Sequence, residues 1–444
     1  MIPYAKNLTL HEDYDIIVVG GGPAGCAAAA AAGREGCKTL LIESSGALGG
    51  MGTLGLVPAW APFSNQEQVV YRGIASELLE ASRHDLPHVR SRKDWLNWVP
   101  IDPEALKRHY DDLMEANHVT VRFYTLVVDV LSENGHVTGL VAASKDGLSV
   151  FRAPVYVDCT GEADIAVGAG APYAKGAEDS GELQPASLCF ILTNVDEYAY
   201  LTGPNLHPQN PDSPIYRIVH DGKYPIIPDT HLCQNLIGPR TVGFNASHLW
   251  DVDSSDPASL SRAQQEGRRI AKALRDALAE YVPAAFANAQ LIETAAAVGI
   301  REGRRIQGEY VLRVEDYLAR RDFPDEIGRN CYYLDVHHDK AHVQEAIDNP
   351  EARRARDQRY GKGESHGIPY SCLLPRQVDN VLVAGRCIST DRLVQGSTRV
   401  MPVCLVTGEA AGLAAAMSLP DGRPAGVDTD QLRDKLRAYG AYIH

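Results

Sequence analysis

The first strongly patterned stretch of the chain is a run of β-branched residues that leads into glycines. Residues 16–19 read IIVV, which predicts a short strand buried on both faces. Residues 20–25 read GGGPAG, and the alanine-rich stretch 26–32 predicts a helix. Residues 39–42, TLLI, predict a second buried strand that ends at Glu43. This order predicts one β–α–β unit.

Two later segments repeat the pattern of short buried strands. Residues 155–158 read VYVD and residues 381–385 read VLVAG, so both are predicted to be buried strands. Pro402 then begins a run of small and apolar residues that predicts a helix. A β-meander inserted between the strands of a parallel sheet is predicted from strand-like stretches with Asn-Gly and Asp-Gly turns, at residues 119–124, 126–131, 137–143 and 148–151.

The region 171–367 differs in amino-acid composition from the segments on either side. Prolines cluster between residues 204 and 228, and tyrosine and histidine become frequent. Asp256 and Pro257 are suited to the N-cap and first turn of a long amphipathic helix. We therefore predict that 171–367 forms a separate domain of mixed α+β structure on the substrate side, and that 421–444 forms a C-terminal helical tail.

Composition and charge narrow the class of protein. The chain is 45% hydrophobic and 23% charged, which is typical of a globular protein, and its net charge of −14 disfavours a nucleic-acid binder. None of the nine cysteines stands at Cys-x-x-Cys spacing, so we expect no zinc site and no iron–sulfur cluster. The N-terminus carries no signal pattern and no 18-residue apolar run occurs, so we expect a cytoplasmic protein without membrane contact. The oligomeric state stays open.

The glycine-rich turn matches a dinucleotide-binding fingerprint, because a strand precedes it and a helix follows. Gly20 would permit the tight turn, Gly22 would let the backbone approach a pyrophosphate, and Gly25 would let the helix pack close to the strand. The start of the helix, at Pro23 and Ala24, would offer N–H groups to the phosphates. Glu43 is placed to accept hydrogen bonds from a ribose, and a carboxylate there disfavours a 2′-phosphate. The alternative is a tight turn without a ligand.

The segments after Glu43 distinguish FAD from NAD. The stretch Gly49, Gly50, Met51, Gly52 and Thr53 resembles the second glycine cluster of the glutathione-reductase-type FAD fold. Thr160 and Gly161 resemble a further signature of that fold, and residues 381–385 resemble its terminal strand. The resemblance implies that FAD is the cofactor and that its site also includes Ser44, Val127, Gly385, Arg386, Arg399, Val400 and Met401.

Further motifs resemble a broad bacterial family of FAD-dependent oxidoreductases, related to fumarate reductases and heterodisulfide-reductase flavoproteins. The motifs include DCTGEAD at 158–164, GIREGRR at 299–305, AGRCIS at 384–389 and RVMP at 399–402. Two departures stand out. The cysteine runs of the iron–sulfur-bearing relatives are missing, and Thr390-Asp391-Arg392 stands where many members carry a histidine. The second departure implies a different substrate if that histidine contacts substrate in the relatives.

The resemblance completes the predicted fold class, which is α/β. A Rossmann-like FAD-binding domain, discontinuous over 13–170 and 368–420, would hold a parallel sheet with the inserted meander. The mixed α+β domain 171–367 would cap it and contribute the substrate site.

Two arginines and a histidine are the first candidates for catalysis. Arg301 and Arg305 are four residues apart, so either a helix or a strand would place them on one face, where they could grip a carboxylate or phosphate. The alternative is an ion-pair network with Glu302 and Glu309. His337 would share a strand face with Tyr333 and Asp335, and the aspartate could prepare it for proton transfer. The alternative for His337 is a structural histidine.

Two further residues are weaker candidates. Tyr370 could line the substrate face of the flavin, or it could be a packed aromatic. Arg399 precedes the helix at Pro402, whose N-terminus in the resembling fold points at the flavin, so a cation there would favour the reduced flavin. A helix-flanking surface charge is the alternative. A metal site at His337 and His338 is not expected, because adjacent residues rarely converge on one ion.

The sequence therefore predicts an FAD-dependent oxidoreductase that moves a hydride between a small polar or anionic metabolite and flavin N5. No second dinucleotide fingerprint follows a strand, so oxygen or an electron-carrier protein is the expected electron partner, and the direction of electron flow stays open. Two alternatives remain. One is an NAD-binding enzyme of the thiazole-synthase type, and the other is a non-catalytic flavin-binding sensor or scaffold.

Overall fold

A five-stranded parallel sheet forms the centre of the computed structural model, which describes residues 2, 5–90, 97–178, 180–337 and 359–444. All neighbouring strands in this sheet run parallel, which is the pairing expected for short, fully buried apolar strands. The predicted β–α–β unit is confirmed, and its first strand lies in the middle of this sheet. The strand order is β19 (Val381–Val383), β10 (Val155–Asp158), β2 (Ile16–Val19), β3 (Thr39–Ile42) and β6 (Thr120–Arg122).

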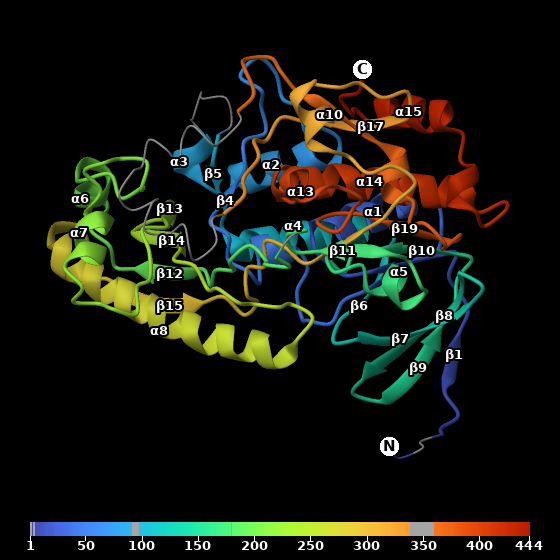
Figure 1. Cartoon of the computed structure of the whole chain (residues 1–444), viewed down its shortest axis with the longest axis horizontal. Coiled ribbons are helices and arrows are strands. Elements are labelled where there is room, and N and C mark those ends of the chain that lie inside the picture. The colour runs from blue at the N-terminus through green and yellow to red at the C-terminus, as the bar shows by residue number, and fades with distance from the viewer. Residues whose placement is uncertain (1, 3–4, 91–96, 179, 338–358) are drawn as a thin grey trace.

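Two helices of small residues pack against each other over this sheet. They are α1 (Pro23–Arg34) and α14 (Met401–Ser418), and Figure 1 shows them side by side. A Cβ on Gly408 would lie 2.1 Å from the carbonyl oxygen of Ala24, so only glycine permits this approach of the two backbones. By length and composition α14 is the one helix of the described residues that could cross a membrane, but 89% of it is buried inside the protein.

The predicted β-meander forms a second sheet that differs from the prediction at one end. Strands β7 (Leu126–Glu133), β8 (His136–Ser144) and β9 (Gly147–Phe151) are antiparallel neighbours, and β1 (Thr9–His11) adds to β9 in parallel. The stretch that we predicted as the first meander strand is instead β6, the edge of the central sheet. Its residues pair with Leu40–Ile42, the buried strand of the β–α–β unit.

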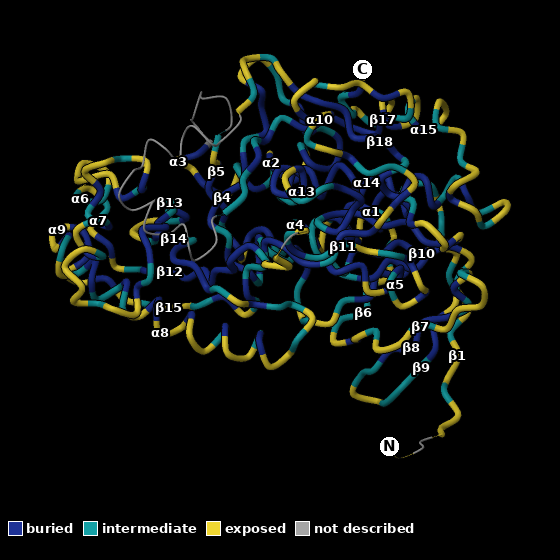
Figure 2. Tube along the Cα trace, viewed as in Figure 1, coloured by how far each residue is buried: buried dark blue, intermediate teal, exposed yellow. Residues whose placement is uncertain are grey.

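A third sheet lies at the other end of the molecule (Figure 1). Its order is β13 (Leu232–Gly238), β14 (Thr241–Ala246), β12 (Phe190–Thr193) and β15 (Gln290–Thr294), and all its pairs are antiparallel. The long helix α8 (Pro257–Tyr281) is capped by the Asp256 carboxylate and buries one face in a core shared with this sheet. Figure 2 shows the opposite face of α8 exposed along its length.

The segment 171–367, which we predicted as one domain, contributes to two regions. Strand β17 (Glu326–Asn330) pairs with β18 (His366–Pro369) beside α14, away from the third sheet. The predicted C-terminal tail contains α15 (Thr429–Ala438), which buries Leu432 and Leu436 in the core around α1 and α14. The remaining helices and strands are β4 (Ala59–Trp60), α2 (Ile74–His84), α3 (Pro87–Arg90), β5 (Val99–Pro100), α4 (Pro103–Ala116), α5 (Asp164–Gly168), β11 (Tyr173–Lys175), α6 (Glu197–Thr202), α7 (Pro214–His220), α9 (Pro283–Phe286), β16 (Arg304–Ile306), α10 (Val314–Leu318) and α13 (Arg392–Thr398).

Candidate functional site

One large cavity connects the central sheet to the third sheet. Its volume is about 1340 Å³. On one side it is lined by the glycine turn after β2 and by the start of α14, and on the other by the ends of β13 and β14. The cavity lies at the carboxyl ends of the parallel strands, where open α/β sheets bind their ligands.

The glycine turn has the geometry that a pyrophosphate site requires. Gly20 has a φ of +96°, and a Cβ on Gly25 would lie 1.8 Å from the carbonyl oxygen of Gly20. Glycine is therefore required at both positions for α1 to start this close to β2. Gly22 differs, because a Cβ there would meet nothing within 4 Å and would project into open space. Gly22, Pro23 and Ala24 line the cavity, so the turn offers a ligand both room and the N-terminus of α1.

Glu43 is held at the end of β3 with its carboxylate at the cavity. Its Oε2 accepts a hydrogen bond of 2.6 Å from the Gly21 amide, and its Oε1 accepts one of 2.7 Å from the Ser45 amide. These two bonds fix the carboxylate while it remains part of the cavity lining together with Ser44. The position suits recognition of a ribose diol, as the fingerprint requires.

Most of the predicted cofactor residues line the cavity, and a few lie behind the lining. The lining includes Gly20, Gly22, Pro23, Ala24, Glu43, Ser44, Gly50, Met51, Val127, Thr160, Gly161, Gly385, Arg386, Arg399, Val400 and Met401. Gly25, Gly49, Gly52 and Thr53 are not among these residues. They support the turn instead: the Gly49 amide donates to Gly21 and the Thr53 hydroxyl donates to Leu48.

Thr160 and Arg386 brace the middle of the cavity. The Asp158 carboxylate accepts a hydrogen bond of 2.8 Å from the Thr160 hydroxyl and also caps α5. Arg386 donates to the Glu162 carboxylate at 2.7 Å and to the Ile300 carbonyl at 2.7 Å. The Arg386 charge is therefore already paired, so its role at the cavity wall is to hold neighbouring segments in place.

The two predicted anion-binding arginines point to different places. Arg301 lines the cavity and is 6% exposed, and its Nη1 donates to the Pro185 carbonyl and to the Ser187 hydroxyl. Burial, with a contribution from Arg399, lowers the pKa of Arg301 to about 10, so it stays charged at neutral pH. Arg305 lies outside the lining and forms a buried ion pair of 2.7 Å with Glu302.

The prediction that both arginines share one face is therefore wrong. The reason is that Arg301 precedes β16, in a segment without helix or strand, whereas Arg305 is paired within β16. Of the alternatives, the ion-pair network describes Arg305, and a cavity-facing cation describes Arg301.

His337 lies in the cavity, but the segment 331–337 is not a strand. The prediction of a shared strand face is wrong, although Tyr333, Asp335 and His337 all line the cavity. The Asp335 Oδ1 lies 3.6 Å from the His337 Nε2, and Arg399 donates to the same carboxylate at 2.9 Å. Burial, together with Arg301, lowers the pKa of His337 well below its ordinary value, and Asp335 opposes this shift only in part. His338 lies outside the described residues.

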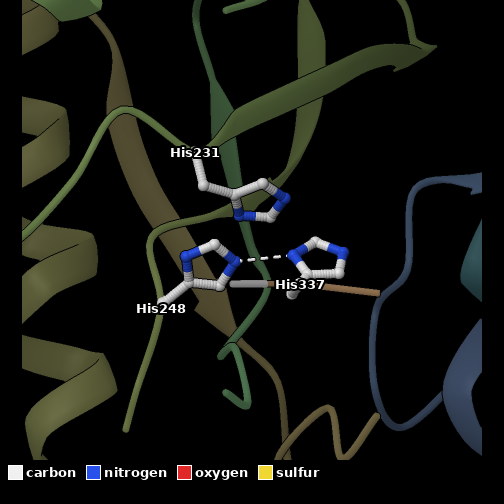
Figure 3. A group of neighbouring side chains, drawn as sticks. All are labelled: His231, His248 and His337. Atoms are coloured by element: carbon white, nitrogen blue, oxygen red, sulfur yellow. Dashed lines mark hydrogen bonds between the residues drawn. The ribbon is translucent and has the colours of Figure 1, made fainter. Parts of the chain in front are cut away.

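Two histidines that the sequence analysis did not single out meet His337. The His248 Nε2 lies 2.7 Å from the His337 Nδ1, and the ring of His231 stacks on that of His248 with centroids 4.5 Å apart (Figure 3). The Asp229 carboxylate forms a hydrogen bond with the His248 Nδ1. It also accepts a hydrogen bond of 3.0 Å from the backbone amide of His231. His231 directly precedes β13, His248 lies two residues after the end of β14, and His337 lies in a distant segment without helix or strand. No local spacing in the sequence could have indicated them, apart from the enrichment of histidine in 171–367.

Of the two weaker candidates, Tyr370 lies outside the cavity lining and Arg399 lies within it. Tyr370 is 2% exposed, does not line the cavity and donates its hydroxyl to the Pro424 carbonyl at 2.8 Å, so the alternative of a packed aromatic describes it. Arg399 lies just before α14 and lines the cavity. Its charge is paired with Asp335, which joins the segment before α14 to the segment that carries His337.

A parallel sheet with this glycine turn and ribose acid defines a dinucleotide-binding oxidoreductase fold. Residues 15–436 match the family described as FAD dependent oxidoreductase, and the chain belongs to that family. It is therefore an FAD-dependent oxidoreductase, and both earlier alternatives, an NAD-binding thiazole-synthase-type enzyme and a non-catalytic flavin protein, are set aside. The room at Gly22 and the cavity-facing Glu43 fit the cofactor of the family.

Several solved structures resemble the chain at low sequence identity. A geranylgeranyl bacteriochlorophyll reductase-like protein from Thermoplasma acidophilum is 13% identical with a TM-score of 0.47, and the match covers 98% of this chain and 93% of that one. A triple mutant of the flavin-dependent brominase Bmp2 is 14% identical with a TM-score of 0.49, over 96% and 84% of the two chains. The p-nitrophenol 4-monooxygenase PnpA from Pseudomonas putida DLL-E4 is 12% identical with a TM-score of 0.43, over 96% and 84%.

Proposed function

We propose that the chain transfers a hydride between a small polar or anionic metabolite and N5 of FAD, inside the cavity between the central and third sheets. The observation that carries this proposal is that one cavity is lined both by the dinucleotide turn and by Arg301 with the histidine cluster. Bound FAD would supply the two-electron chemistry, and the protein would supply orientation and electrostatics.

The residues that would hold FAD follow from the shape of the cavity. Gly22 and the N-terminus of α1 would receive the pyrophosphate, and Glu43 would bind the adenosine ribose. The arrangement supports a glutathione-reductase-type mode of FAD binding, in which the start of α14 borders the flavin. Met401 and Val400 line the cavity at that point.

The far end of the cavity would bind the substrate. Arg301 is buried and charged. Its Nη1 donates both of the hydrogen bonds that the structure describes for this side chain. A buried guanidinium is suited to bind a carboxylate or another anionic group through charge-assisted hydrogen bonds. His248 and His337 lie at the same end and would contact the oxygen of the substrate carbon that is oxidised or reduced. A hydroxy acid or the corresponding oxo acid has both groups.

An anaerobic screen of the FAD-loaded protein tests this proposal. Hydroxy acids are expected to bleach the visible absorbance of the flavin, and uncharged alcohols of the same size are expected to do so more slowly. NADH and NADPH are expected to reduce the flavin slowly or not at all, because the sequence holds no second dinucleotide fingerprint. Oxygen or an electron-carrier protein would then reoxidise the flavin. Rapid reduction by NADH with no reduction by any hydroxy acid would contradict the proposal.

A further inference from the structure

The histidine cluster has the arrangement of a metal-ligand set. Each of His231, His248 and His337 offers one ring nitrogen to a common point, and the three nitrogens lie within 4.8 Å of one another. Figure 3 shows one nitrogen of His231 turned toward the nitrogens that His248 and His337 present to each other. His231 and His248 are 3% and 7% exposed, so the group is buried except toward the cavity that it lines.

The nitrogens that face away from this point have partners of their own. Asp229 bonds the His248 Nδ1, the Asp335 Oδ1 lies 3.6 Å from the His337 Nε2, and the Cys233 Sγ lies 3.8 Å from the His231 Nε2. The Asp229 carboxylate on the outer nitrogen of His248 places the imidazole proton there and leaves a lone pair on the inner nitrogen. Such carboxylate–histidine pairs orient and strengthen metal ligands.

A hydrogen bond lies where an ion would bind. With its own proton on Nδ1, His248 accepts at Nε2 a hydrogen bond of 2.7 Å from the His337 Nδ1. A divalent ion placed at the common point takes the place of the proton in this hydrogen bond and binds the third nitrogen as well. The Asp229 carboxylate lies directly behind His248, whereas the Asp335 carboxylate near His337 is also paired with Arg399.

From this geometry we infer that His231, His248 and His337 bind a divalent transition-metal ion of the zinc type, with a further coordination position open to the cavity. Imidazole nitrogens are ligands for this class of ion, and sites with three protein ligands keep a position for water or substrate. Nitrogens around a tetrahedral zinc ion lie about 3.3 Å apart, since each bond is about 2.0–2.1 Å long. The ion would therefore move the His248 Nε2 and the His337 Nδ1 apart by about 0.6 Å from their separation of 2.7 Å.

The open position gives the ion a role in the proposed reaction. A substrate oxygen bound there would be polarised by the ion while the anionic group of the same substrate lies on Arg301. This role rests on the proposed function, whereas binding of the ion does not. His337 would then act as a ligand, rather than as the proton-transfer group that its sequence context predicts.

Calorimetric titration of the chelator-treated, FAD-loaded protein with Zn²⁺ tests the site. We expect one ion per chain with a dissociation constant that is roughly micromolar or tighter. His248→Ala and His337→Ala should each weaken binding by about 100-fold or more, and Asp229→Asn by about 10- to 100-fold, because it loses only the carboxylate behind His248. His136→Ala removes a surface histidine that is also paired with a carboxylate, Asp379, and should leave the affinity unchanged.

The outcomes separate this site from the proposed function. Absence of one-to-one Zn²⁺ binding by the wild-type protein would overturn the metal site whatever the variants do, and so would equal affinities for wild type and His248→Ala. Retention of FAD by each variant shows that its fold is intact. If Zn²⁺ binds as expected but no candidate substrate bleaches the flavin, then the proposed function fails and the metal site stands.

Discussion

Replacing Gly22 with valine is expected to give a folded protein that has lost its FAD. The space beside Gly22 is open, and its φ of −72° is one that any residue adopts. The added Cβ therefore meets no protein atom and strains no backbone, but the side chain projects into the place where the pyrophosphate would approach α1. Loss of about two charge-assisted hydrogen bonds, at roughly 1.5–3 kcal/mol each, predicts an FAD dissociation constant raised by about 100-fold or more.

The measurement is the affinity for FAD, followed by flavin fluorescence and compared with the thermal stability of the apoprotein. Gly238→Val is the matched control, because Gly238 also has free space but lies on β13 outside the cavity lining. Wild-type affinity in Gly22→Val, or equal losses in both variants, would show that the glycine turn is not the pyrophosphate site.

The two arginines of the 301–305 segment are expected to give opposite phenotypes when each is replaced by methionine. Arg301→Met should keep FAD and fold but lower kcat/KM for an anionic substrate by roughly 100-fold or more, because loss of one partner of a buried charged contact costs about 2–5 kcal/mol. Arg305→Met should leave catalysis by the folded fraction unchanged. It should lower the stability by about 3 kcal/mol, because Glu302 loses its closest charged partner and keeps Arg392 at 3.1 Å and the Gln184 amide at 2.9 Å.

Steady-state kinetics with an anionic and an uncharged substrate, together with melting temperatures, separate these outcomes. The loss in Arg301→Met should be confined to the anionic substrate, and Arg305→Met should melt several degrees lower than wild type. A similar loss of kcat/KM for both substrates in Arg301→Met would contradict the assignment of Arg301 as an anion-binding residue.

Local pattern was sufficient to predict the part of the fold that binds the cofactor. The β2–α1–β3 unit, its glycine turn and Glu43 all lie within 28 consecutive residues, 16–43, so their contacts are set by strand and helix periods over a short distance. The strand before Thr160, the strand before Gly385 and the helix at Pro402 were also predicted correctly. Each is a largely buried run in which apolar or small residues predominate, and such a run favours an element inside the protein.

The substrate side could not be predicted in the same way, because distant segments build it. His231 and His248 meet through the pairing of β13 with β14, and His337 reaches them from a loop that has no regular structure. The same limit explains why the sequence alone could not exclude Arg305 and Tyr370 from the substrate site. Their residue types suit a binding site equally well, but a buried Glu302 and the Pro424 carbonyl are already their partners.

A crystal structure of the FAD-loaded protein tests the central claim most directly, since that claim concerns where the reacting ring lies. We predict that the flavin ring occupies the cavity beside Met401, and that Arg301, His248 and His337 border the space next to its reactive edge. A flavin ring that lies outside this cavity, with Arg301 and His337 separated from it by other protein atoms, would contradict the account.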